Sequence, residues 1–120
     1  MADWKLGAVE ARFADLIWEN EPLSSGALAK LALEALDWKK TTAFTVLKRL
    51  CDREIFKNEG GTVTALISRE DFYARQSEEY LQESFGGSLP AFLVAFGRSK
   101  KLSVEEVEEL QRLIDGMRGE

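Results

Sequence analysis

Apolar residues recur three or four positions apart in three successive stretches of the first half of the chain. This spacing places apolar side chains on one face of a helix. It predicts helices over about 7–19, from a cap at Ser24 or Ser25 to about residue 35, and over about 40–53. The predicted inward-facing residues are Leu6, Val9, Phe13, Leu16 and Ile17, then Leu28, Leu31, Ala32 and Ala35, then Ala43, Val46, Leu47 and Leu50. Because a short turn at 36–38 joins the last two helices, the pattern is typical of a helix-turn-helix.

The pattern changes after the third helix, where residues typical of strands replace the helical spacing. Residues 55–58 form a short candidate strand, and the β-branched run 62–67 is the candidate return strand. Glu59-Gly60-Gly61 between them is a hairpin signal. Three helices followed by such a hairpin predict a winged helix-turn-helix with a two- or three-stranded β wing.

Helical spacing returns in the second half of the chain. We predict a fourth helix from the capping signal at Ser68 to about Glu83, a fifth from Leu89 ending before a polar loop at 97–101, and a last helix after the capping box at Ser103. Gly86-Gly87 separates the fourth from the fifth. The fold class is therefore mainly α, with a winged helix domain over 1–68 and a C-terminal three-helix region over 69–120.

The C-terminal region is rich in Phe, Leu and Tyr, yet about 50 residues bury too little surface to fold firmly alone. It either packs back on the winged domain or pairs with a second copy, and we favour a two-fold symmetric dimer. The residues predicted for this dimerisation surface are Phe72, Tyr80, Phe85, Leu89, Phe92, Leu93, Phe96, Leu110, Leu113 and Ile114.

The third predicted helix has a second face that is polar and basic. Thr41, Phe44, Thr45, Lys48 and Arg49 lie on it. The segment 38–57 carries six basic and two acidic residues in a chain of net charge −5. A short helix of this kind, preceded by another short helix, is how proteins read the DNA major groove.

The composition narrows the alternatives. The chain has no histidine and one cysteine, which argues against a Cys/His zinc site and against histidine as a general base. We therefore expect no enzyme, no metal and no cofactor. The acidic balance disfavours nonspecific nucleic-acid binding, so any DNA affinity must come from a local patch. No apolar run approaches about 18 residues, so we expect no membrane insertion, and the unpaired cysteine fits a cytoplasmic protein.

An ordered set of motifs resembles the penicillinase repressor family of the BlaI, MecI and CopY type. The motifs are Leu6-Gly7-Ala8-Val9-Glu10 with Leu16-Ile17-Trp18, then Trp38-Lys39-Lys40-Thr41-Thr42 with Thr45-Val46-Leu47 and Arg49-Leu50, then Gly86-Gly87-Ser88-Leu89 with Leu102-Ser103 and the segment 105–110. The resemblance implies a dimeric transcriptional repressor that binds an inverted-repeat operator in double-stranded DNA.

By position, the resemblance also assigns DNA contacts. Thr41, Thr42, Phe44 and Thr45 would meet base edges, whereas Lys40, Lys48 and Arg49 would hold phosphates. The full set of predicted DNA-binding residues is Lys39, Lys40, Thr41, Thr42, Phe44, Thr45, Lys48, Arg49 and Lys57.

The chain departs from the family pattern at several positions. Glu54 lies at the end of the third predicted helix, where relatives have a glycine, which adopts the left-handed conformation without strain. Lys57 is the wing's one base, beside Glu59, so we expect modest, salt-sensitive DNA affinity. Some relatives are cleaved at an Asn-Phe bond after a membrane sensor protease acts; the corresponding bond here is Ala95–Phe96. The Cys-x-Cys pairs of the copper-responsive relatives are absent from the sequence.

Two other functions stay open at this point. The acidic surface, Glu54 and the poorly basic wing are also consistent with a winged-helix protein-interaction module that has lost specific DNA binding. Aromatic residues between the winged domain and the dimerisation helices could instead line the pocket of a small-molecule sensor, although aromatics at helical spacing usually form a core.

Overall fold

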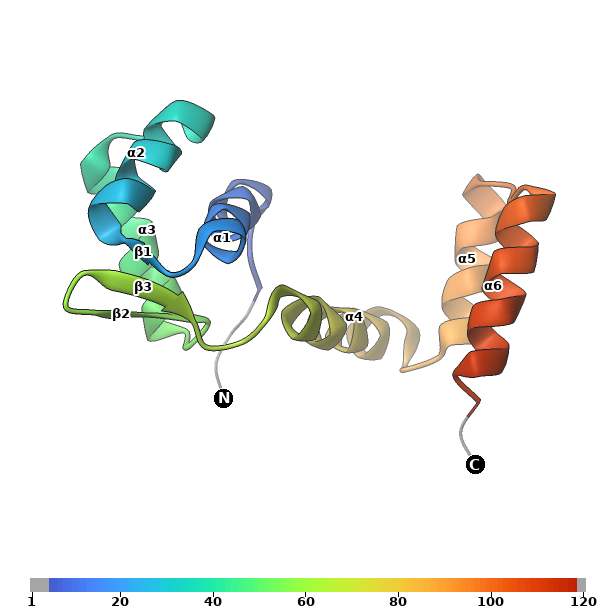
Figure 1. Ribbon diagram of the computed structural model, residues 1–120. Coiled ribbons are helices and arrows are strands. Elements are labelled where there is room, and N and C mark those ends of the chain that lie inside the picture. Colours follow the sequence, from blue (N-terminus) through green and yellow to red (C-terminus); the bar gives the residue numbers. More distant parts are fainter. Residues whose placement is uncertain (1–4, 119–120) are drawn as a thin grey trace. The chain divides into compact units, whose positions relative to one another are not determined.

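Six helices and three short strands make up residues 5–118, the part of the chain that the computed structural model describes (Figure 1). The chain forms two units, 1–77 and 78–120, and the division lies inside helix α4 (Arg69–Phe85). We predicted a domain boundary before this helix, between residues 68 and 69. The outer ends of both predicted domains, 1–4 and 119–120, lie outside the described residues.

The first unit begins with the three predicted helices, α1 (Ala8–Asn20), α2 (Ser25–Leu36) and α3 (Lys40–Asp52). The Ser24 hydroxyl caps α2, because its oxygen accepts a hydrogen bond from the Ala27 amide at 3.0 Å. Asp37 ends α2 in the left-handed conformation, with φ of 56°. The turn between α2 and α3 is therefore short, and the helix-turn-helix is confirmed.

The wing is a three-stranded antiparallel sheet. Strand β2 (Phe56–Glu59) pairs with β3 (Thr62–Ala65), and Gly60 and Gly61 make the turn between them with positive φ. The short strand β1 (Leu23–Ser24) pairs with the other edge of β3, so the strand order is β1-β3-β2. The winged helix-turn-helix fold is thus confirmed, and of the two predicted strand numbers, two or three, the wing has three.

The core of the first unit joins all these elements. It consists of Phe13, Ala14, Ile17, Leu28, Ala29, Ala32, Ala43, Val46, Leu47, Leu50, Ile55, Phe56, Val63 and Phe72. Two residues that we predicted to face inward do not do so. Val9 and Ala35 are exposed, because each lies at the edge of the apolar stripe of its helix.

Phe72 corrects one assignment to the dimerisation surface. This residue of α4 is fully buried in the core of the first unit. Its ring centroid lies 5.3 Å from that of Trp18 on α1. The start of α4 therefore belongs to the winged unit, and Phe72 is not available to a partner.

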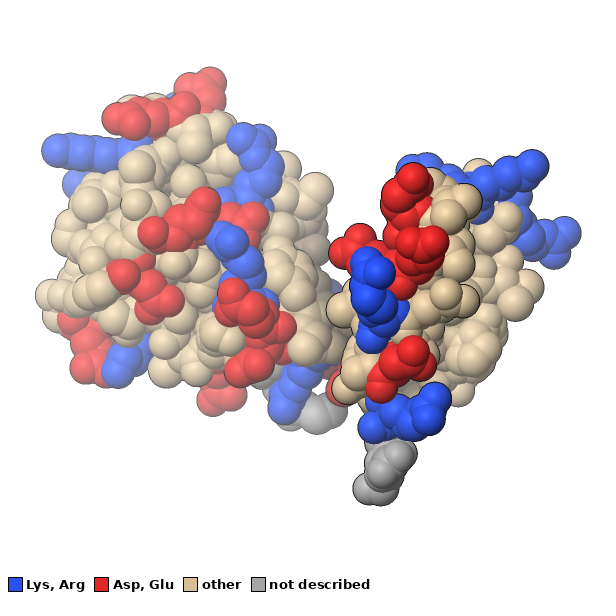
Figure 2. All heavy atoms as spheres, turned by 45° about the vertical axis from the view of Figure 1, so that its right-hand side comes forward, with Lys and Arg blue, Asp and Glu red and all other residues tan. Residues whose placement is uncertain are grey.

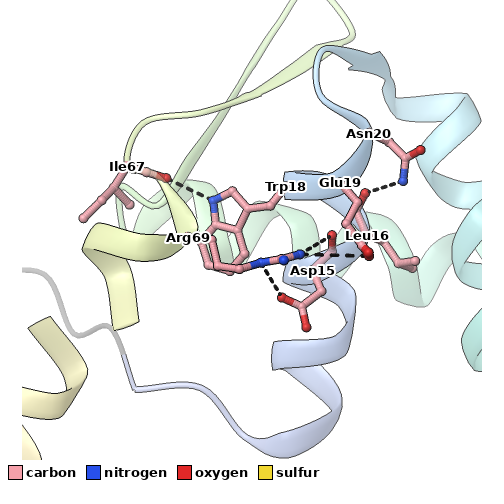
Figure 3. A network of polar contacts seen from close by, with 7 residues as sticks. All are labelled: Asp15, Leu16, Trp18, Glu19, Asn20, Ile67 and Arg69. Carbon is pink, nitrogen blue, oxygen red and sulfur yellow. Dashed lines mark hydrogen bonds and ion pairs between the residues drawn. The ribbon is translucent and has the colours of Figure 1, made fainter. Parts of the chain in front are cut away.

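Arg69 and Trp18 fasten the start of α4 to α1 (Figure 3). The Arg69 Nε lies 3.2 Å from Asp15 Oδ1, and its guanidinium lies over the Trp18 ring at 6.0 Å from the centroid. The Trp18 indole donates a hydrogen bond to the Ile67 carbonyl at 3.0 Å. These contacts fix the chain as it leaves the wing.

The second unit contains the end of α4, α5 (Leu89–Ser99) and α6 (Val104–Gly116). Ser88 and Ser103 cap α5 and α6, and Ser103 forms the predicted capping box with Glu106. Helix α5 continues to Ser99, so the segment predicted as a loop from residue 97 is partly helical. Within residues 5–118, no helix has both the length and the apolar character needed to cross a membrane.

Candidate nucleic-acid interface

Helix α3 presents its polar face to solvent. Its apolar face is anchored by Ala43, Val46, Leu47 and Leu50, all of which are buried. The other side therefore projects outward, and it carries the predicted DNA contacts Thr41, Thr42, Phe44, Thr45, Lys48 and Arg49 as exposed residues. Lys39 and Lys40 are exposed at the start of the same helix, and Lys57 is exposed on β2.

Several of these cations have partners within the chain. Lys48 Nζ lies 3.6 Å from Asp52 one turn later on α3, and Arg49 Nη1 lies 3.6 Å from Glu10 Oε2 on α1. The Lys40 ammonium lies 5.5 Å from the centroid of the Phe44 ring. Each exposed contact of this kind stabilises the fold by about 1 kcal/mol or less, so a phosphate group can replace it at a small cost in free energy.

The wing lysine is paired as well. Lys57 Nζ lies 2.9 Å from Glu59 Oε1, and this hydrogen bond, together with the lysine's charge, lowers the pKa of Glu59. Figure 2 shows that acidic side chains are interspersed with basic ones on the visible face of each unit. Lys48, Arg49 and Lys57 thus each have an acidic side chain within 4 Å.

The Thr45 hydroxyl is turned back to its own helix. Its Oγ1 donates a hydrogen bond to the Thr41 carbonyl at 2.9 Å. The hydroxyl hydrogen is therefore used within α3. The remaining Thr45 groups that a ligand could meet are its methyl group and the lone pairs of its hydroxyl oxygen.

Among the hollows that adjoin the exposed face of α3, two are lined mainly by residues of this helix. The first, which we call the threonine hollow, has a volume of about 280 Å³ and is lined by Thr41, Thr42, Thr45, Val46 and Arg49. The second, of about 420 Å³, lies between α3 and the wing and is lined by Ser25, Phe44, Leu47, Lys48, Cys51 and Asn58. Sequence reasoning missed Ser25 and Asn58, because only the packing of α2 and β2 against α3 brings them there.

Cys51 is the chemically distinctive residue of the second hollow. It is half-buried, and burial, followed by the nearby charge of Asp52, raises the pKa of its thiol. A raised thiol pKa means less thiolate at neutral pH, so Cys51 acts here as a small apolar group. In the described residues, no group of His, Cys, Asp and Glu is arranged to hold a metal ion.

Glu54 has the conformation that its position predicted. Its φ is 62°, in the left-handed region that glycine adopts without strain. Its amide donates to the Cys51 carbonyl at 3.0 Å, and the Ile55 amide donates to the Leu50 carbonyl at 3.1 Å. These bonds end α3 and turn the chain into the wing, so Glu54 sets how α3 connects to β2.

The other predicted dimerisation residues all lie in the second unit. Tyr80, Phe85 and Phe92 stack edge to face in one aromatic cluster, to which Phe96 is joined through Phe92. The remaining members are Leu89, Leu93, Leu110, Leu113 and Ile114 on α5 and α6. None of the residues described between 78 and 118 is buried, and Tyr80, Leu113 and Ile114 are each more than half exposed.

The Ala95–Phe96 bond lies inside α5, and both of its residues are exposed. A protease needs an extended segment, so cutting here would require local opening of α5. Cleavage of this bond stays a prediction.

Comparison with known proteins adds a family to this geometry. The family model described as penicillinase repressor matches residues 6–116. The methicillin resistance regulatory protein MecI of Staphylococcus aureus strain Mu50 is 21% identical, with 93% of this chain and 94% of the relative covered. A penicillinase repressor of Staphylococcus aureus is 20% identical (96% and 89% covered), and one of Bacillus licheniformis is 23% identical (92% and 90% covered).

Proposed function

The chain belongs to the penicillinase repressor family, and we propose that it is a dimeric transcriptional repressor that binds an inverted-repeat DNA operator through α3 of each copy. The family is one of regulators rather than enzymes, and two of the relatives above are named as repressors. The observation that carries the proposal is the exposed face of α3, whose threonines and cations project from a firmly packed helix.

The arrangement around α3 supports a role in the major groove. A short helix fits this groove, and the neighbouring wing supplies a second contact to the DNA backbone. Lys48 and Arg49 lie on the final turns of α3, where they would hold phosphates and set the register. Thr41 and Thr45 lie one turn apart on the same face and would meet bases.

The second unit supports the proposed dimer. Its apolar side chains remain largely exposed in a single chain, and Figure 2 shows a broad area without charged groups on this unit. Contiguous exposed apolar surface commonly marks a protein interface. A second copy would cover this surface and display two recognition helices, which an inverted repeat requires.

One observation favours the alternative of a protein-interaction module. Lys48, Arg49 and Lys57 each lie within 4 Å of an acidic side chain of the same chain. A surface with paired charges attracts DNA phosphates less strongly than one with unpaired cations. This reading predicts no sequence-specific DNA binding at moderate salt.

The deciding experiment measures DNA binding by the full chain. An operator is sought by selection from random duplexes and from the chain's own upstream region, and affinity is measured by fluorescence anisotropy at several salt concentrations. The double variant Lys48→Ala/Arg49→Ala removes two cations from each copy of the proposed dimer, so it should weaken binding to every duplex and lower the salt slope by roughly 3.6. The matched control Lys100→Ala/Lys101→Ala removes the same charge from the second unit and should leave the slope unchanged.

The outcomes separate the two functions. Sequence-specific binding that depends on Lys48 and Arg49 supports the repressor. If no duplex is bound specifically, the interaction module is favoured. An unchanged slope in the Lys48/Arg49 variant would show that these residues do not contact phosphates.

A further inference from the structure

The threonine hollow differs from an ordinary polar helix face in what it offers to a base. The Thr45 hydroxyl hydrogen is bonded to the Thr41 carbonyl, so it is not available as a donor. With Oγ1 directed to that carbonyl, the methyl group takes another staggered position on Cβ. Thr45 is exposed and is one of the residues that line the hollow.

The other walls have a similar character. The other lining residues are Thr41, Thr42, Val46 and Arg49, of which the two threonines and the valine carry methyl groups. The Arg49 guanidinium is drawn toward Glu10 on α1, with Nη1 and Oε2 separated by 3.6 Å. The hollow is thus a recess of about 280 Å³ whose lining residues include a valine and three threonines.

We propose that the threonine hollow receives the 5-methyl group of an operator thymine, and that the Thr45 methyl is the group that distinguishes this base. The inference rests on the proposed function, since it requires α3 to lie in the major groove. It adds what that function leaves open, namely the base that one position of the recognition helix prefers and the chemical group that reads it.

The pattern of base edges explains the preference. Thymine presents a methyl group and the O4 acceptor in the major groove, and guanine presents only the acceptors N7 and O6. A threonine whose hydroxyl hydrogen is already used cannot donate to guanine, whereas its methyl can pack against the thymine methyl. Adenine and cytosine could donate to the hydroxyl oxygen, but neither has a methyl group to fill the hollow.

The test replaces each thymine of the selected operator, one at a time in one half-site, by deoxyuridine, which lacks only the 5-methyl group. The affinity of the full chain is then measured by fluorescence anisotropy. Burying one methyl-sized group corresponds to about fourfold in affinity. We expect a loss of about fourfold at one thymine of the half-site.

Two variants identify the reading group. Thr45→Val keeps a methyl group and removes the hydroxyl, so it should retain the fourfold preference for thymine over deoxyuridine at that position. Thr45→Ser keeps the hydroxyl and removes the methyl, so the preference there should vanish while the effects at other thymines stay as in the unchanged chain. Circular dichroism of both variants checks that α3 is intact.

Each outcome decides the proposal. If Thr45→Ser keeps the preference and Thr45→Val loses it, the hydroxyl reads the base and the inference is wrong. If deoxyuridine has no effect at any position while the operator is still bound specifically, the inference fails and the proposed function stands. If no operator can be selected at all, both fail.

Discussion

Replacing Glu54 by glycine should stabilise the winged unit, because this residue is held in a conformation that disfavours a side chain. Its φ is 62°, and a residue with a Cβ in the left-handed region costs roughly 1–2 kcal/mol. Glycine removes that strain but loses more freedom on folding, which costs roughly 0.5–1 kcal/mol. The net expectation for Glu54→Gly is a gain of about 1 kcal/mol in the free energy of unfolding.

The measurement is thermal and urea unfolding followed by circular dichroism. For a unit of this size, about 1 kcal/mol corresponds to a rise in melting temperature of roughly 4–8 °C. Two controls separate the causes. Glu54→Gln removes the charge but keeps Cβ, so it should leave stability nearly unchanged. Asp37→Gly acts at a second non-glycine position whose φ is positive, 56°, and should gain less stability, because aspartate tolerates this conformation better than glutamate.

The reasoning would be refuted if Glu54→Gly were no more stable than the unchanged chain. It would also be refuted if Glu54→Gln gave the same gain, since the effect would then come from the charge and not from the backbone. The same pair informs the proposed DNA contact: both variants remove one negative charge near the end of α3 and should raise DNA affinity equally at low salt.

Three further predictions follow from the packing and the charges. Phe72→Ala should lower the free energy of unfolding, measured in urea, by about 3–5 kcal/mol, because its ring fills the core of the first unit. Phe44→Ala, on the exposed face of α3, should lower it far less. Equal losses in the two variants would contradict the placement of Phe72. Glu10→Gln should raise DNA affinity about twofold by releasing Arg49, and a fall in affinity would mean that Glu10 positions this arginine for binding. Ile114→Glu should raise the dissociation constant of the proposed dimer more than tenfold in sedimentation equilibrium, whereas Gln111→Glu should not. If Ile114→Glu left the dissociation constant unchanged, the interface would lie elsewhere.

Much of the fold follows from short-range signals. Apolar residues at helical spacing and the predicted caps at Ser24 or Ser25 and at Ser103 placed the helices to within a few residues. The glycine pair between β2 and β3 placed the wing turn. These signals act between residues a few positions apart, so they can be read without knowing how the chain packs.

The candidate site could be predicted only in part. The exposed residues of α3 follow from its periodicity, because a helix whose apolar face is buried must show the opposite face to solvent. The back-bonded Thr45 hydroxyl could not be predicted, since threonine on a helix has a choice of rotamers. The hollow beside the wing also escaped prediction, because Asn58 and Ser25 reach α3 from other elements.

The sequence by itself determined the kind and order of the elements and the chemistry displayed on α3, because periodicity and capping are local properties. The tertiary structure alone decided that Phe72 belongs to the winged core and that Arg49 is paired with Glu10. Both contacts join residues distant in sequence, and such contacts depend on how helices pack against one another. No pattern along the chain encodes that packing directly.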